Sequence, residues 1–157
     1  MATEAKNICS PTLTSIIFDK NSAESGGAIY NQGINNGESS PIITNSLFTN
    51  NNAQNSGGAI NNVGLNSGDS SPIITNSTFF NNTADLSGFG FRGGAISNEG
   101  SNGKSSPMIR NTILFGNNAG AGNEIGNLNA SPNVRYSLVQ GGCPTDTNCG
   151  DEIYNYQ

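Results

Sequence analysis

Three charged side chains recur at one position of a repeated loop. Glu38, Asp69 and Lys104 each stand three residues before a proline, in the similar segments GESSP, GDSSP and GKSSP. If these segments stacked as neighbouring strands, the carboxyl groups of Glu38 and Asp69 would lie on the order of 5 Å apart, near the separation found in retaining glycosidases, and they could also bind calcium. We favour a solvated loop that tolerates charge, because flexible Gly-Ser loops hold catalytic geometry poorly.

Two arginines form a second candidate column. Arg110 and Arg135 each follow a repeated proline by three residues, a position at which earlier units carry threonine. Stacked guanidinium groups could bind a carboxylate or an acidic sugar, because their planar fork matches carboxylate geometry. The alternative is an outer face that only keeps the protein soluble. Threonine occupies this column in three units and has no second column beside it, which argues against an ice-binding face: Thr14, Thr44 and Thr75.

The remaining composition offers little catalytic chemistry. The chain contains no histidine, so it has no imidazole base and no histidine metal ligand. Asp19, Asp69 and Asp85 fall at different positions of the repeated pattern, so the sequence shows no aspartate cluster of the kind that holds calcium in pectate lyases. We therefore predict a protein that is not an enzyme and that has no cofactor and no metal site.

An internal repeat defines all of these positions. Prolines 11, 41, 72, 107 and 132 open five units with spacings of 30, 31, 35 and 25 residues, and the segment SSPIITNS occurs twice letter for letter. The units share the pattern S-P-x-[ILV]-x-N-S-x-F-x-x-N-x-A followed by G-G-A-I. Two columns are apolar in every unit: Leu13, Ile43, Ile74, Ile109 and Val134, and Phe18, Phe48, Phe79, Leu114 and Val139. Two columns are mostly polar: Ser15, Asn45, Asn76, Asn111 and Tyr136, and Asn21, Asn51, Asn82 and Asn118.

The spacing of the two apolar columns requires a corner between them. They lie five residues apart, so a straight strand would place them on opposite faces. A left-handed bend at the polar column, for example at Asn45, would turn Ile43, Ser46 and Phe48 toward one interior. Such bends are favoured because 27 Asn and 21 Gly make up almost a third of the 157 residues.

Each unit then becomes one rung of a coil. Equivalent residues would stack about 4.8 Å apart, with asparagine side chains joined in hydrogen-bonded ladders and phenylalanine rings stacked on one another. We predict an all-β fold, a single-stranded right-handed parallel β-helix of about four to five rungs. It forms one domain over residues 1–157, with rungs over 10–142, an N-terminal lead or cap over 1–9 and a C-terminal tail or cap over 143–157.

A family resemblance supports this fold. The segment PIITNSLFTNNNAQNSGGAIN resembles right-handed parallel β-helix repeat proteins of the polymorphic outer-membrane and choice-of-anchor type, and NTILFGNNAGAGNEIGN with SPNVRYSLVQGGCP is similar to their closing rungs. The resemblance covers roughly residues 10–142. It implies a bacterial protein that is secreted or displayed at the cell surface, with a leader and an anchor that we expect to lie outside this segment.

Charge and hydropathy exclude two classes of partner. The formal net charge is −5 with only six Lys and Arg, so there is no basic face for a nucleic acid backbone. No apolar run approaches the roughly 20 residues that span a bilayer, so we expect no membrane insertion by this segment.

Two local features stand outside the repeat. The third unit has five extra residues, and we predict that Phe89, Phe91 and Arg92 form a contact loop, because exposed aromatics with an arginine concentrate binding energy. The alternative is that this loop folds back over the core. Cys143 and Cys149 could close a small loop by a disulfide if the protein lies outside the cell, which would leave Cys9 unpaired.

The ends of a solenoid complete the functional hypothesis. Each end exposes unpaired strand backbone and an apolar cross-section, and the short segments 2–8 and 151–157 are the available covers. We therefore predict end-to-end association of the chain with itself, or contacts with other surface proteins or glycans. The sequence favours an extracellular or cell-surface structural or adhesive module; the alternative is a carbohydrate-binding or polysaccharide-degrading β-helix.

Overall fold

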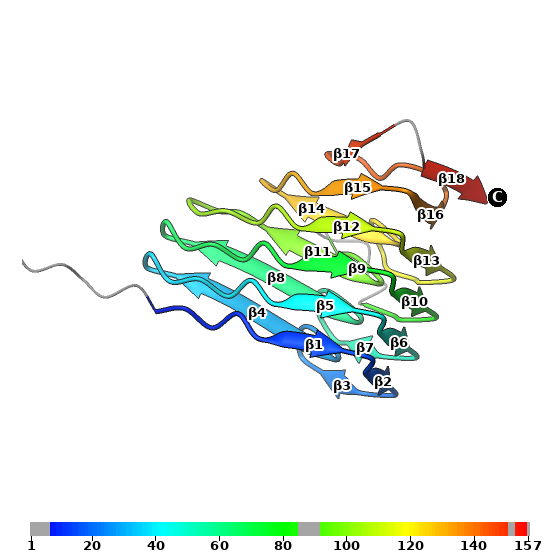
Figure 1. Ribbon diagram of the computed structural model, residues 1–157, viewed down its shortest axis with the longest axis horizontal. Helices are drawn as coiled ribbons and strands as arrows, with labels where there is room; N and C mark the ends of the chain where they lie inside the picture. Colours follow the sequence, from blue (N-terminus) through cyan, green and yellow to red (C-terminus); the bar gives the residue numbers. More distant parts are fainter. Residues whose placement is uncertain (1–6, 85–91, 151–152, 157) are drawn as a thin grey trace, which may run out of the picture.

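The chain forms a stack of short strands that rises from its N-terminal to its C-terminal end (Figure 1). A computed structural model describes residues 7–84, 92–150 and 153–156. These residues form eighteen strands and no helix, so the described part contains no helix that could cross a bilayer. Every pairing between strands is parallel, which confirms the predicted parallel β-helix.

Four sheets run along the coil. The first sheet contains, in spatial order, β1 (Thr12–Thr14), β5 (Ile42–Thr44), β9 (Ile73–Thr75), β12 (Met108–Arg110), β15 (Asn133–Arg135) and β17 (Asn148–Cys149). The second sheet contains β2 (Ile17–Asp19), β6 (Leu47–Thr49), β10 (Thr78–Phe80), β13 (Ile113–Phe115), β16 (Ser137–Gln140) and β18 (Ile153–Tyr156). The third sheet contains β4 (Ile29–Ile34), β8 (Ile60–Leu65), β11 (Ile96–Glu99) and β14 (Ile125–Leu128), and the fourth contains β3 (Ser22–Ala23) and β7 (Asn52–Ala53).

The register of these sheets pairs equivalent residues of successive repeat units. Ile43 lies opposite Ile74 in the first sheet, and Phe48 lies opposite Phe79 in the second. The segment expected to be a tail supplies β17 and β18, which extend the first two sheets beyond β15 and β16. Equivalent letters of the sequence therefore occupy equivalent places in successive rungs.

The predicted corner is present in every rung. The residue between the first and second sheets has a positive φ of 50° to 57° in all five units: Ser15, Asn45, Asn76, Asn111 and Tyr136. The serine after Asn45 turns inward, where the Ser46 hydroxyl donates to the Thr44 carbonyl oxygen at 2.9 Å. Ile43, Ser46 and Phe48 are all buried, as predicted. Asparagine is common at this corner because its short side chain tolerates the left-handed region.

The core is a narrow bore whose apolar lining comes from one column of residues in each of the three larger sheets. Ile43, Phe48 and Ile60 are completely buried, and their equivalents in the next rungs are at most 2% exposed. The rings of Phe18, Phe48 and Phe79 form a continuous stack with centroid separations of 4.6 and 4.5 Å. The second glycine of the GGAI segment has no room for a side chain, because a Cβ at Gly58 would clash with the carbonyl oxygen of Gly94.

Two asparagine ladders line this bore. We call Asn21, Asn51, Asn82 and Asn117 the first ladder; each amide nitrogen donates to the Oδ1 of the next member at 2.8–2.9 Å. The second ladder is Asn31, Asn62, Asn98 and Asn127, with three equivalent bonds of 2.9 Å. The placement of Asn118 in this column was wrong. Thr83 pairs with Asn118, so Asn117 follows Asn82 in the ladder and Asn118 is exposed.

We expect Asn117→Ala to lower the free energy of unfolding by about 1–3 kcal/mol, because the backbone N–H of Asn82 would lose its buried acceptor. The matched control Asn118→Ala changes a neighbouring asparagine that is exposed, and it should stay within about 0.5 kcal/mol of the parent. Urea unfolding followed by circular dichroism measures both. Equal losses in the two variants would contradict the ladder assignment.

Candidate functional site

The acidic column predicted from the repeated loops is present. Glu38 pairs with Asp69, and Asp69 pairs with Lys104, in parallel bridges between successive rungs. The Asp69 carboxylate accepts a hydrogen bond from the Ser71 hydroxyl and forms an ion pair of 3.2 Å with the Lys104 ammonium group. The Asp69–Lys104 ion pair is therefore partly exposed and lies on a loop. Such a pair contributes at most about 1 kcal/mol to stability.

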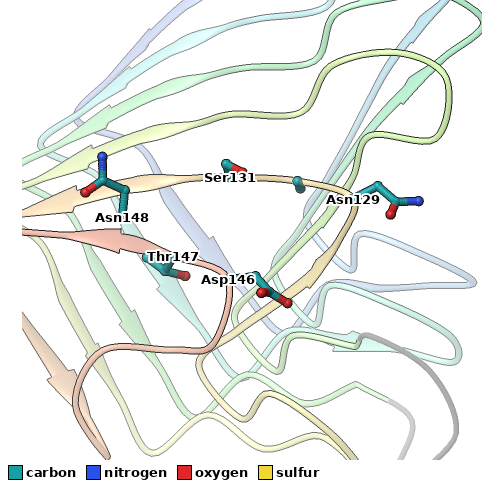
Figure 2. Close-up of a pocket in the computed structure, with 6 residues that line it drawn as sticks. Asn129, Ser131, Asp146, Thr147 and Asn148 are labelled. Carbon is teal, nitrogen blue, oxygen red and sulfur yellow. The ribbon is translucent and has the colours of Figure 1, made fainter.

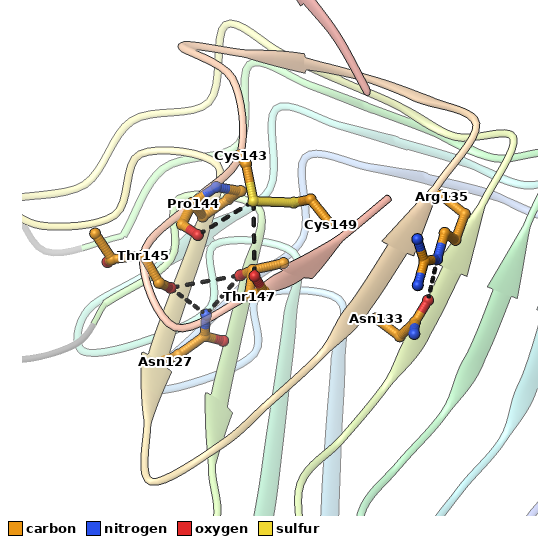
Figure 3. Close-up of a disulfide and its surroundings, with 8 residues drawn as sticks. All are labelled: Asn127, Asn133, Arg135, Cys143, Pro144, Thr145, Thr147 and Cys149. Atoms are coloured by element: carbon orange, nitrogen blue, oxygen red, sulfur yellow. Dashed lines mark hydrogen bonds between the residues drawn. A yellow bond between two sulfur atoms is a disulfide. The ribbon is translucent and has the colours of Figure 1, made fainter. Parts of the chain in front are cut away.

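The arginine column also lies in register. Arg110 pairs with Thr75 on one side and with Arg135 on the other, on the outer face of the first sheet. Arg110 is exposed. Arg135 donates through Nε to the Asn133 side-chain oxygen at 3.2 Å (Figure 3) and packs against the backbone of Gly150. The two guanidinium groups thus belong to adjacent strands. That of Arg135 is held by the side-chain amide of Asn133.

The predicted contact loop lies mostly outside the described residues. Phe89 and Phe91 fall within 85–91, so their role stays a prediction. Arg92 is half-buried, and its backbone passes so close to Gly126 on β14 that a Cβ at Gly126 would clash with it.

Exposed apolar side chains form two outward columns that the sequence reasoning missed. We call them the outer apolar columns. Four of their isoleucines are 38–70% exposed: Ile42 and Ile73 on the first sheet, and Ile17 and Ile113 on the second. Register places Met108 after Ile73, and Leu47 and Thr78 between Ile17 and Ile113. For the first of these columns the signal was the doubled isoleucine of PIIT, in which the first residue must face out when the second faces the bore.

A disulfide loop closes the C-terminal end of the third sheet. Cys143 and Cys149 are joined by a disulfide, and Cys9 is free and exposed. The loop lies over β14, where the Asn127 amide donates to the Thr145 carbonyl oxygen at 2.9 Å and to the Thr147 hydroxyl at 3.0 Å (Figure 3). The loop therefore provides acceptors for the last member of the second ladder.

A polar groove of about 490 Å³ borders this loop. Figure 2 shows the Asn129 and Asp146 side chains at one end of the groove, Asn148 at the other and Ser131 between them. Ala130 and Thr147 complete the lining. Amide, hydroxyl and carboxylate groups of this kind suit hydroxyl-rich ligands. Within the described residues, no group of three or more Cys, Asp or Glu could hold a metal ion.

Glu124 closes the first ladder from inside the bore. It follows Ala28, Ala59 and Ala95 in its column, and its side chain is 4% exposed. Its Oε2 accepts a hydrogen bond from the Asn117 amide, whereas Oε1 is buried without a hydrogen-bond partner. Burial raises the pKa of the Glu124 carboxyl to about 7, and the bonds from Asn117 only partly oppose this shift.

We expect stability to fall as the pH rises from about 4.5 to about 7. Across this window the folded protein keeps a proton on Glu124 that the unfolded chain, with a carboxyl pKa near 4.5, has released. Glu124→Gln keeps the size and an acceptor but does not titrate, so it should flatten this part of the profile. Urea unfolding at a series of pH values measures the effect. An unchanged slope in Glu124→Gln would contradict the assignment.

We expect Cys143→Ser with Cys149→Ser to destabilise the protein by about 2 kcal/mol, the loop-closure value for so short a loop. The loss should be concentrated at the C-terminal end, because the acceptors of Asn127 become mobile. Thermal unfolding and hydrogen exchange of β14 measure it, with Cys9→Ser as the matched control that leaves both unchanged. A double variant as stable as the control would show that the loop does not stabilise this end.

Comparison with known proteins finds a match to one family model. Residues 15–32 and 45–63 match the model of the Chlamydia polymorphic membrane protein repeat, in the first and second rungs. Neither the search of curated proteins nor the search of solved structures gave a match. Both matched segments run from the left-handed corner, through the first ladder and the GGAI segment, into the third sheet. The chain is therefore a parallel β-helix repeat protein whose first two rungs match the Chlamydia polymorphic membrane protein repeat.

Proposed function

We propose that the protein is a non-enzymatic structural or adhesive module of the bacterial cell surface, which contacts other surface proteins or glycans through the outside of its coil. The outer apolar columns carry this proposal. Ile42 and Ile73 lie side by side in adjacent rungs of the first sheet, and exposed apolar surface of this kind is typical of interaction sites. In the second sheet, Ile17 and Ile113 lie at the two ends of a column that also holds Leu47 and Thr78.

Two further observations support a location outside the cytoplasm. The polymorphic membrane protein repeat is a surface repeat, and the Cys143–Cys149 disulfide suits the oxidising conditions of exported proteins. The rigid stack below the columns also favours binding, because parallel strands in fixed register hold the isoleucines in place without the entropy cost of ordering a loop.

We expect Ile42→Thr with Ile73→Thr to weaken binding at least about tenfold, the effect of losing two central apolar contacts. Threonine already fits this column at Thr12, so the melting temperature should hold. Fluorescently labelled protein is titrated onto bacterial outer-membrane vesicles and onto cultured epithelial cells. Ile34→Thr, an exposed isoleucine on the third sheet, is the matched control. Equal binding by the double variant and the control would exclude the columns, and no binding by the parent protein to either surface would exclude the adhesive role.

A carbohydrate-binding or polysaccharide-degrading role is the second candidate, and the Arg110–Arg135 pair favours it. Two guanidinium groups on adjacent strands match the repeated carboxylates of an acidic polysaccharide. Incubation with acidic polysaccharides, with and without calcium, separates the two roles. A thermal shift that Arg110→Gln removes would support binding, whereas unsaturated cleavage products would overturn the non-enzymatic proposal.

A further inference from the structure

Both asparagine ladders have the same polarity. In each ladder the amide nitrogen donates toward the C-terminal end of the coil and the Oδ1 atom faces the N-terminal end. Backbone groups fix this orientation in the first ladder: the Oδ1 of Asn51 accepts the backbone N–H of Asn21, while its amide nitrogen donates to the carbonyl oxygen of Phe18. An inverted amide would place donor against donor, so the polarity follows from the backbone.

The C-terminal ends of both ladders are closed by the chain itself. The amide of Asn117 donates to the buried Glu124 carboxyl group, and the amide of Asn127 donates to Thr145 and Thr147 of the disulfide loop. No ladder donor in the described residues is left for another molecule at this end.

The N-terminal ends of both ladders, in contrast, are open. No described residue donates a hydrogen bond to the Oδ1 of Asn21 or Asn31. Asn21 is exposed, whereas Asn31 is only 5% exposed. Strands β1, β2 and β4 are the terminal strands of their sheets at this end (Figure 1). The apolar cross-section is also incompletely covered there, because Leu13, Phe18 and Ile29 are only partly buried whereas their equivalents in the second rung are fully buried.

We propose that the N-terminal end of the coil is an interaction surface for a β-solenoid rung of another segment, one that presents two asparagine amide groups as donors in register with Asn21 and Asn31. Such a rung would cover the apolar cross-section, pair its strands with β1, β2 and β4, and extend both ladders by one member. The inference rests on the proposed role as a surface module and names the kind of partner that this end receives.

The polarity of the ladders limits which ends of two molecules can associate. At the C-terminal end of a second copy, the described residues leave no ladder amide free to donate. Head-to-tail filaments would therefore leave the side-chain oxygens of Asn21 and Asn31 without a ladder donor. Two N-terminal ends brought together would set acceptor against acceptor. The complementary partner is therefore an open rung of the same type, with its own ladder donors still available.

The test adds such a rung to the full chain. A copy of residues 38–68, which contains the ladder residues Asn51 and Asn62, is inserted between Asn7 and Ile8; in a second protein the same copy follows Gln157. We expect the N-terminal insertion to raise the melting temperature and to slow hydrogen exchange of the β1, β2 and β4 amides at least about tenfold, because terminal strands become internal. The C-terminal copy should do neither.

A matched variant tests whether the amide donors of the inserted rung are responsible for this protection. Replacing both ladder asparagines of the inserted copy by aspartate keeps its size but removes its donors, so the protection of β1, β2 and β4 should be lost. Protection that persists in the aspartate variant, or equal stabilisation by the copy at either end, would overturn the inference. So would filaments of the unmodified protein that lengthen with concentration in sedimentation experiments. A failure here leaves vesicle and cell binding unaffected, so it can be distinguished from a failure of the proposed surface role.

Discussion

The fold depends on hydrogen bonds between asparagine side chains in successive rungs. After the second sheet of each of the first three rungs, one backbone N–H bonds to the side-chain oxygen of an asparagine in the next rung instead of to a backbone carbonyl oxygen. The Asn51 side chain shows the solution: its oxygen accepts the backbone N–H of the rung below, and its nitrogen serves both a carbonyl oxygen of that rung and the next asparagine. Because each buried polar group needs such a partner, each of the first four rungs carries a residue of the first ladder.

This constraint explains why the sequence repeats inside the coil and varies outside it. Inward positions must match the rung above and the rung below, so Ile, Phe, Asn and Ala recur there. Outward positions meet solvent, and the same column can hold threonine in one rung and arginine in another, as at Thr75 and Arg110. Functional surfaces are therefore found on the outward columns and at the ends, where the stacking leaves the choice of residue open.

The sequence predicted most of the interior because the spacing of the repeat carries the register. Counting from the apolar column of the second sheet places Asn51 three residues after Phe48, and the same count from Leu114 reaches Asn117. The prediction of Asn118 was wrong because that residue was aligned by the alanine next to it. The strand of the second sheet, which sets the register, would have given Asn117. The corner at Asn45 was predictable, since two inward residues five apart require a bend.

The exterior and the C-terminal end were harder to predict. Glu124 follows alanines in its column, and only the three-dimensional structure shows that its carboxyl group reaches the end of the first ladder. The bond between Cys143 and Cys149 depends on geometry as well as on the compartment, which spacing does not reveal. Phe89 and Phe91 lie outside the described residues, so the contact-loop prediction stands as it was made.

Hydrogen exchange of the asparagine side-chain amides, resolved by nuclear magnetic resonance, tests the central claim most directly. Ladder members such as Asn62 and Asn82 are completely buried, so their side-chain NH₂ protons should exchange far more slowly than those of the exposed Asn52 and Asn118. Equally fast exchange at all four positions would contradict a coil held together by asparagine ladders.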